Sequence, residues 1–359
     1  MYLVRGNRAA GRSVILSDAK NPLVTVRATT RMVWYNVRVY ERLDVARTKD
    51  GAEIEIGLVT APDLDLCNSI LQLLSHKSPD TKYHLAAALD GKTGELETRF
   101  YLGMLDGQPV ANITTMESRG VGILGHVFTR PEHRRRGICR EVMARQMHEF
   151  RSRGGTVLLL STGFESHPYW IYHSFGFRSF AGGRMRYATE PDFEREWLSP
   201  GPGRVVKASW NHWPLVALLA TVPGNEILRS AAWQVHRTGW LEGMYCSFMR
   251  MRDRDESIRG VVLEKDTGAV IGCATVAPAA TWPGVWQVDA FAGPQSGENE
   301  LNRMLDKLTI PPGRAIAYVD EQASDKMRAL ERIGFRREAV LKEHLRLESE
   351  RFDVHIYSR

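Results

Sequence analysis

The chain has 359 residues, which is longer than one average domain and enough for two domains that each bury a core. Its 43% hydrophobic and 25% charged residues exclude a disordered or fibrous protein. The longest strongly apolar run, 213–222, is too short to cross a bilayer, so no membrane partner is expected. Four scattered cysteines without a CxxC pair argue against a disulfide framework or a zinc site, and predict a cytoplasmic protein without a metal.

The net charge of +6 is confined to the start of the chain. Residues 1–50 carry ten Lys and Arg against four Asp and Glu, so the rest of the chain is formally neutral. A folded domain with a broad basic face is therefore not expected, which disfavours a nucleic-acid partner. We interpret 1–50, with β-prone runs at 23–26 and 32–40, as a poorly defined basic extension. A nucleic-acid-binding arm or a targeting peptide is the alternative.

The first half of the chain reads as alternating strands and helices. A strand is expected over 53–59, followed by a helix that begins at Thr60 with Asp63 completing a capping box. Strands over 98–105, 110–117 and 123–129, with glycine in the turns, predict an antiparallel meander. A helix over 137–150 and a doubly buried strand over 156–160 complete the pattern.

The second half repeats this order after a Pro- and Gly-rich linker at 199–203. Segment 166–178 aligns with 324–336 at a constant offset of 158. Each predicts a short helix capped by serine (Ser166, Ser324) and ended by glycine (Gly176, Gly334). Two copies of one α/β unit account for this most simply. The remaining expected elements are strands over 205–208, 259–264, 270–277, 285–291 and 314–319, and helices over 213–222, 226–236 and 298–308.

The loop at 134–139 joins a strand to a helix and carries three arginines before a glycine. A helix N-terminus offers unpaired N–H groups and a positive dipole end to an anion. Gly137 lets a ligand approach the backbone, and arginines suit a diphosphate. A basic surface turn that only caps the helix is the alternative. We favour an anion-binding loop.

This loop resembles motif A of the GNAT N-acetyltransferase superfamily, with Arg134, Gly137 and Cys139 at the marked positions. Tyr172 to Phe177 is similar to the Tyr-x-x-x-Gly-Phe ending of that family. Cys139 is a departure, since Gly or Ala is usual there. The run His-Arg-Arg-Arg-Gly also loosely resembles Eis-type tandem acetyltransferases.

The resemblance implies an α/β (α+β) fold of two tandem GNAT-like units, each a mixed, mostly antiparallel twisted sheet flanked by helices. Residues 51–198 would be the active N-acetyltransferase domain and 204–359 a degenerate GNAT-like domain. The two units would form an intramolecular pseudo-dimer, and a homo-oligomer is left open.

The resemblance further implies an acetyl-CoA (acyl-CoA)-dependent N-acetyltransferase, in which a small-molecule or peptide amine attacks the thioester directly in a ternary complex. Tyr172 matches the general acid that protonates the leaving thiolate; its alternative is a packing role. A catalytically weak acyl-CoA-binding sensor or scaffold is the second hypothesis. The expected acetyl-CoA-binding residues are Val127, Phe128, Thr129, Arg134, Arg135, Arg136, Gly137, Ile138, Cys139 and Arg140.

The proton acceptor for the amine stays open among Glu117, His126, Glu165, His167 and a solvent relay. In the second half, Leu330 replaces Tyr172, and the loop at 294–298 has no arginine but an acidic Glu298. We therefore expect one working site per chain, with the second unit packing against the first or shaping the acceptor cleft.

Overall fold

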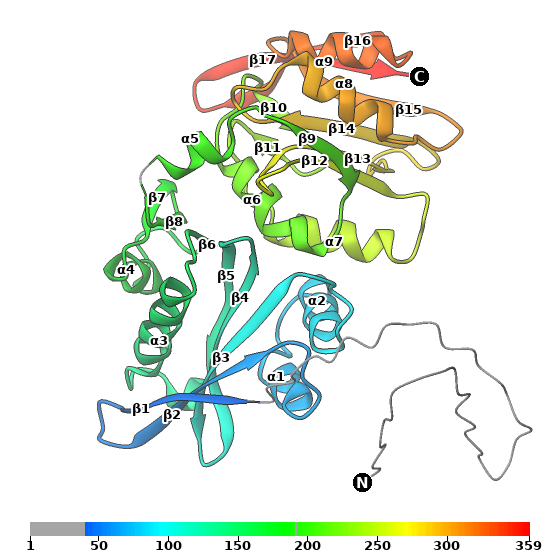
Figure 1. The fold of residues 1–359 in the computed structure, drawn as a ribbon. Helices are drawn as coiled ribbons and strands as arrows, with labels where there is room; N and C mark the ends of the chain where they lie inside the picture. Colours follow the sequence, from blue (N-terminus) through cyan, green and yellow to red (C-terminus); the bar gives the residue numbers. More distant parts are fainter. Residues whose placement is uncertain (1–39, 191) are drawn as a thin grey trace, which may run out of the picture. The chain divides into compact units, whose positions relative to one another are not determined.

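The computed structural model describes residues 40–190 and 192–359 (Figure 1). The basic segment interpreted as an extension lies outside the described residues as far as residue 39. Among the described residues, no helix combines the length and apolarity needed to cross a membrane.

The first half of the chain builds an eight-stranded sheet in the order β1-β2-β3-β4-β5-β6-β8-β7. All neighbouring strands are antiparallel except β5 and β6, which run parallel. The strands are β1 (Glu41–Arg47), β2 (Glu53–Thr60), β3 (Glu97–Leu105), β4 (Gln108–Ser118), β5 (Val121–Thr129), β6 (Val157–Ser161), β7 (Arg178–Ala181) and β8 (Arg184–Ala188). The helices are α1 (Cys67–Leu73), α2 (Pro79–Leu89), the 3₁₀ turn η1 (Pro131–His133), α3 (Ile138–Ser152), α4 (His167–Ser174) and α5 (Phe193–Trp197).

The two faces of this sheet bury different partners, because successive side chains of a strand point to opposite faces. On β3, Tyr101 packs with α3 and α4, whereas Phe100 and Leu102 pack with α1 and α2. On β5, Leu124 faces α3, whereas Ile123 packs against residues of the second half. The meander predicted for these strands is confirmed.

Two features of the first half differ from the sequence prediction. Strand β1 pairs with β2, so the sheet begins before Gly51 and the expected extension ends earlier. The first helix begins at Cys67 and not at Thr60, because Thr60 continues β2 and the Asp63 carboxylate accepts from the Leu66 N–H, 2.9 Å away. Helices α2 and α5 were not predicted, although Ser78 and Pro79 give α2 a capping residue and a proline in its first turn.

The second half builds a seven-stranded sheet in the order β16-β17-β15-β14-β13-β12-β9, with one parallel pair, β14 and β15. Its strands are β9 (Gly203–Lys207), β12 (Arg259–Lys265), β13 (Val270–Pro278), β14 (Trp286–Ala292), β15 (Ala315–Asp320), β16 (Arg336–Leu347) and β17 (Glu350–Ser358). Strands β10 (Leu228–Ser230) and β11 (Val235–His236) form a separate two-stranded sheet. The helices are the 3₁₀ turn η2 (Trp210–His212), α6 (Trp213–Thr221), α7 (Glu242–Arg252), α8 (Glu298–Lys307) and α9 (Ser324–Arg332).

The predicted fold class is confirmed: an α+β protein with two mixed, mostly antiparallel sheets flanked by helices. Helices α8 and α9 pack on one face of the second sheet, around Met304 and Leu330. Helix α6 packs on the other face and also against Met116 and Ile123 of the first sheet. All nine residues of α6 are buried, as expected for a helix that is apolar on every side.

Three predictions for the second half are corrected. Residues 226–236 do not form a helix but carry β10 and β11. Ser324 is the first residue of α9 and does not cap it, since the N-cap is Ala323. Gly203, placed in the linker, is the first residue of β9. Helix α7 was not predicted.

Candidate functional site

The parallel strands β5 and β6 pair only at their beginnings and then separate. Their register joins Val121 to Val157 and Ile123 to Leu159, and among the described residues it goes no further. The Arg130 N–H donates to the Val110 carbonyl of β4. Because alternate residues of a strand bond the same neighbour, Val127 and Thr129 direct their backbone groups away from β4, toward the gap.

A cleft of about 920 Å³ lies at this separation. It is lined by β5, by the loop before α3, by the start of α3 and by α4. Of the residues predicted to bind acetyl-CoA, nine line it: Val127, Phe128, Thr129, Arg134, Arg135, Gly137, Ile138, Cys139 and Arg140.

The loop before α3 shapes one end of the cleft. Gly137 is the N-cap of α3 with φ 87°, and no side chain caps this helix. Arg135 also has a positive φ, 64°. Left-handed residues at this spacing turn backbone N–H groups toward a common point, which favours an anion. An open, uncapped helix N-terminus beside exposed arginines is thus present at the position where the sequence predicted it.

Arg136 is the exception among the predicted binding residues. Its Nε lies 2.7 Å from Asp50, its guanidinium lies 3.1 Å from Nδ1 of His133, and it does not line the cleft. Lys49 takes a place there instead, with its backbone N–H donating to the Arg136 carbonyl. Lys49 was not predicted because residues 1–50 were assigned to an extension, although Lys49-Asp50-Gly51 has the composition of a turn between strands.

Tyr172 lies on α4 and lines the cleft with only 6% of its surface exposed. Burial raises its pKa well above the ordinary phenol value, and Cys139 and Glu242 add to the rise. The phenol is therefore neutral over the whole physiological range. Cys139 beside it is also neutral, because burial raises the pKa of its thiol to about 11.

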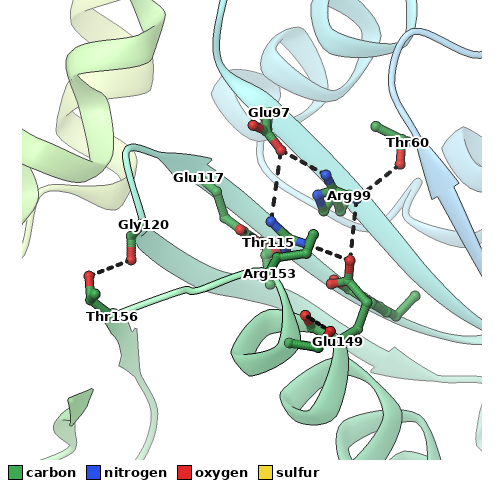
Figure 2. A network of polar contacts seen from close by, with 11 residues as sticks. Thr60, Glu97, Arg99, Thr115, Glu117, Gly120, Glu149, Arg153 and Thr156 are labelled. Carbon is green, nitrogen blue, oxygen red and sulfur yellow. Dashed lines mark hydrogen bonds and ion pairs between the residues drawn. The ribbon is translucent and has the colours of Figure 1, made fainter. Parts of the chain in front are cut away.

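Two of the four candidate proton acceptors lie outside the cleft. Glu117 is buried at the opposite end of β4, where it accepts from Thr115 and pairs with Arg153 at 2.8 Å (Figure 2). Burial raises the pKa of Glu117, and the Arg153 charge opposes the rise. Glu165 is exposed and is not among the lining residues.

The other two candidates line the cleft. His167 is exposed at the start of α4. His126 is buried in β5 with φ 51°, beside a register shift, and Asn112 donates to its carbonyl. Burial lowers the pKa of His126 to about 3, so its imidazole is neutral and a weak base.

One further side chain enters the cleft from the second half. Glu242, the first residue of α7, lines it beside Gly125 and His126. Its Oε1 lies 3.8 Å from Nδ1 of His126, and its Oε2 accepts from Nε1 of Trp240 at 3.3 Å. The sequence analysis missed Glu242 because α7 was not predicted; the one signal was the cluster of aromatic residues around it.

The equivalent position in the second half is filled by the chain itself. Strands β14 and β15 also pair only at their beginnings, Trp286 with Ala315 and Gln287 with Ile316. Strand β10 contacts both of them. A pocket of about 90 Å³ remains at the N-terminus of α8, where the Gly297 N–H donates to Glu300.

Buried charged side chains hold this inserted segment by its backbone. Asp320 accepts from the N–H groups of Ile227 and Leu228 at 3.1 and 2.8 Å. Lys326 donates to the Arg229 carbonyl at 3.0 Å and to Asp289 at 3.1 Å. Burial alone would lower the pKa of Lys326, but Asp289 and Glu226 raise it above the ordinary value, so the ammonium stays charged.

Comparison with known proteins finds partial similarity. Residues 101–185, from β3 to β8, match the family model described as FR47-like protein. No curated protein gives a significant match to the sequence. Among solved structures, an N-acetyltransferase from Staphylococcus aureus Mu50 is similar at 14% identity and a TM-score of 0.37, over 44% of this chain and 98% of that one.

Two further similar structures contain acetyl-CoA. A putative acetyltransferase from Salmonella typhimurium, solved with acetyl-CoA, shares 14% identity at a TM-score of 0.36, over 44% of this chain and 94% of that one. A GNAT superfamily phosphinothricin acetyltransferase from Sinorhizobium meliloti, in complex with AcCoA, shares 13% identity at a TM-score of 0.34, over 44% and 88%. Each is similar to less than half of this chain.

Proposed function

We propose that this chain is an N-acetyltransferase that moves an acetyl group from acetyl-CoA to a primary amine, at one site in the first half. The observation that carries the proposal is the separation of β5 from β6 directly beside the uncapped start of α3. A sheet normally satisfies its backbone groups with a neighbouring strand, so a strand edge left facing a cleft is suited to a ligand with amide groups.

Different parts of the cleft suit different chemical groups of acetyl-CoA. The pyrophosphate would accept hydrogen bonds from the start of α3 and from Arg134 and Arg135. The pantetheine amides would pair with the backbone of Val127 and Thr129. A backbone N–H at this edge would polarise the thioester carbonyl as an oxyanion donor.

Reaction then follows from proximity. The amine, from a small molecule or a peptide, attacks the thioester carbon while both substrates are bound, and the C–S bond breaks as the C–N bond forms. Tyr172 donates its proton to the leaving thiolate. Because burial disfavours the phenolate, this transfer occurs together with C–S cleavage and the phenol is reprotonated at once.

A binding and turnover experiment tests the proposal. Calorimetry should show one acetyl-CoA bound per chain, and a thiol-release assay across a panel of amines should show turnover. Tyr172→Phe should lower kcat by about 10²- to 10⁴-fold with little change in acetyl-CoA affinity, because it removes the general acid alone. Tyr187→Phe is the matched control, since Tyr187 packs on Phe177 and does not line the cleft.

Three results would speak against the proposal in different ways. Absence of acetyl-CoA binding would reject the site itself. Binding without thiol release on any amine would favour the sensor or scaffold hypothesis. Full activity of Tyr172→Phe would leave the transferase intact and remove the role of Tyr172.

A further inference from the structure

Glu242 is the one acidic side chain among the described residues that line the cleft. The other charged side chains there are the cations of Lys49, Lys77, Arg134, Arg135 and Arg140. Cations suit the phosphates of acetyl-CoA, whereas a lone carboxylate among them would only repel those phosphates. A carboxylate in this cleft suits a different ligand group, one that is positively charged.

The carboxylate of Glu242 is held close against β5. A Cβ added at Gly125 would lie 2.9 Å from its Oε1, so the strand has no side chain where the carboxylate sits. About a quarter of the Glu242 side chain, 26%, is exposed. Its charge also contributes to the raised pKa of Tyr172, so the two groups act on one region of the cleft.

Most of the groups around Glu242 are uncharged, and one cation, Lys77, acts on it. His126 on β5 and His84 on α2 are both neutral, because burial lowers the pKa of each to about 3. Cys246 on α7 is a neutral thiol, since burial raises its pKa. Lys77, before α2, is the one cation near it, and burial lowers the pKa of Lys77 while Glu242 opposes this.

We propose that Glu242, supplied by the second half of the chain, binds the ammonium group of the acceptor and takes its proton before attack. The inference rests on the proposed transferase function and names its missing proton acceptor. It also assigns a use to the second half, which completes the active site of the first. The acceptor class is a primary amine that is protonated in solution.

The protons balance over one turnover. The ammonium gives one proton to Glu242, and the free amine attacks the thioester carbon. The new C–N bond forms and the C–S bond breaks. The thiolate takes the proton of Tyr172, and the second proton lost by the amide nitrogen restores Tyr172. Glu242 then releases its proton to solvent. A raised carboxyl pKa, which burial gives Glu242, makes it a stronger base than an exposed carboxylate.

The test compares Glu242→Gln with the wild-type chain on two classes of primary amine at neutral pH. One is strongly basic and protonated, and the other is weakly basic and already neutral. Glu242→Gln should lower kcat/KM by about 10²- to 10⁴-fold for the first and much less for the second, because a neutral amine needs no initial deprotonation. The acid limb of the pH–rate profile should disappear in Glu242→Gln and remain in Glu242→Asp at a lower rate.

Controls separate this role from a structural one. Glu256→Gln removes the same charge from an exposed position after α7 and should behave as the wild type. Acetyl-CoA affinity of Glu242→Gln should stay within about 2-fold of wild type. Equal losses for both amine classes, no loss for either, or loss of acetyl-CoA binding would each overturn the inference. A wild-type chain that turns over no amine would instead reject the proposed function, and the role of Glu242 with it.

Discussion

In both halves of this chain, two parallel strands pair only at their beginnings and then separate. The space beside the separation is an open cleft in the first half and is largely filled in the second. In the first half, β5 and β6 part and leave a cleft of about 920 Å³ lined by cations. In the second half, β14 and β15 part and β10 contacts both of them, and a pocket of about 90 Å³ remains. The gap that forms a cleft in the first half is thus covered by another segment of the chain in the second. The backbone of that segment is held by the side chains of Asp320 and Lys326.

The start of the following helix shows the same contrast. Helices α3 and α8 both follow a glycine N-cap that supplies no side-chain cap, but the Gly297 N–H before α8 donates to Glu300. Glu298, the acidic residue of the loop at 294–298, pairs with Arg328 at 2.6 Å. The second half thus excludes an anion by supplying its own carboxylate at the helix start and its own chain at the strand edge.

Removing the buried cation of the second half should have the largest effect, a loss of stability. Lys326→Met leaves Asp289 and Glu226 buried without their positive partner, which costs about 3–5 kcal/mol in the free energy of unfolding. Urea unfolding measures the change. Arg328→Met on the same helix, an exposed ion pair, should stay close to wild type. Equal stability of the two variants would show that the charges do not hold β10 in place.

Removing the cations of the first half should affect binding and not stability. Arg134→Ala with Arg135→Ala should weaken acetyl-CoA binding by about 10- to 100-fold, because charge-assisted hydrogen bonds to phosphate are lost. Calorimetry gives the dissociation constant. Arg136→Ala is the matched control, since Arg136 pairs with Asp50 outside the cleft. A larger effect of Arg136→Ala than of the double variant would place the phosphates elsewhere.

Acidic pH should destabilise the fold through the buried contact between the two halves. His84 is buried against Trp210 and Trp213, and neither of its ring nitrogens has a hydrogen-bond partner among the described residues. Burial lowers its pKa from 6.5 to about 3, so its contribution is present above pH 6.5 and is lost as the pH falls toward 3. At pH 5 the loss is about 2 kcal/mol.

Unfolding measured at pH 7.5 and pH 5 checks this expectation. His84→Phe should reduce the difference in stability between the two pH values, whereas His148→Phe, at an exposed position on α3, should leave it unchanged. An undiminished acid loss in His84→Phe would assign the sensitivity to other groups, His126 first among them.

The sequence predicted most of the elements whose signal is local. Glycine in the turns set the limits of the meander, and Gly137 after three arginines located the uncapped start of α3. Residues 226–236 were misassigned because their conformation depends on Asp289, Asp320 and Lys326, which are distant in sequence. Helix propensity is a weak signal where buried side chains already satisfy the backbone in another way.

Only the part of the candidate site that is contiguous in the sequence was predicted. Tyr172 and nine of the proposed binding residues lie within one stretch of chain, and the resemblance of its motifs to the acetyltransferase family joined them. Lys49 and Glu242 reach the cleft through tertiary contacts, so no local pattern joined them to it. Arg136 was assigned to the site with its neighbours, but the orientation of its side chain depends on Asp50. Asp50 was not predicted to contact the folded domain because it fell in the expected extension.

The position of helix α6 has a consequence for how the chain folds during synthesis. It fills the apolar face formed by Met116, Ile123 and Leu159, yet it lies in the second half of the sequence. During synthesis at roughly 5–20 residues per second, this face stays uncovered for several seconds after β6 has emerged. The first half therefore completes its core only when the second is being made. Although the halves repeat one plan, we expect them to unfold in one cooperative transition.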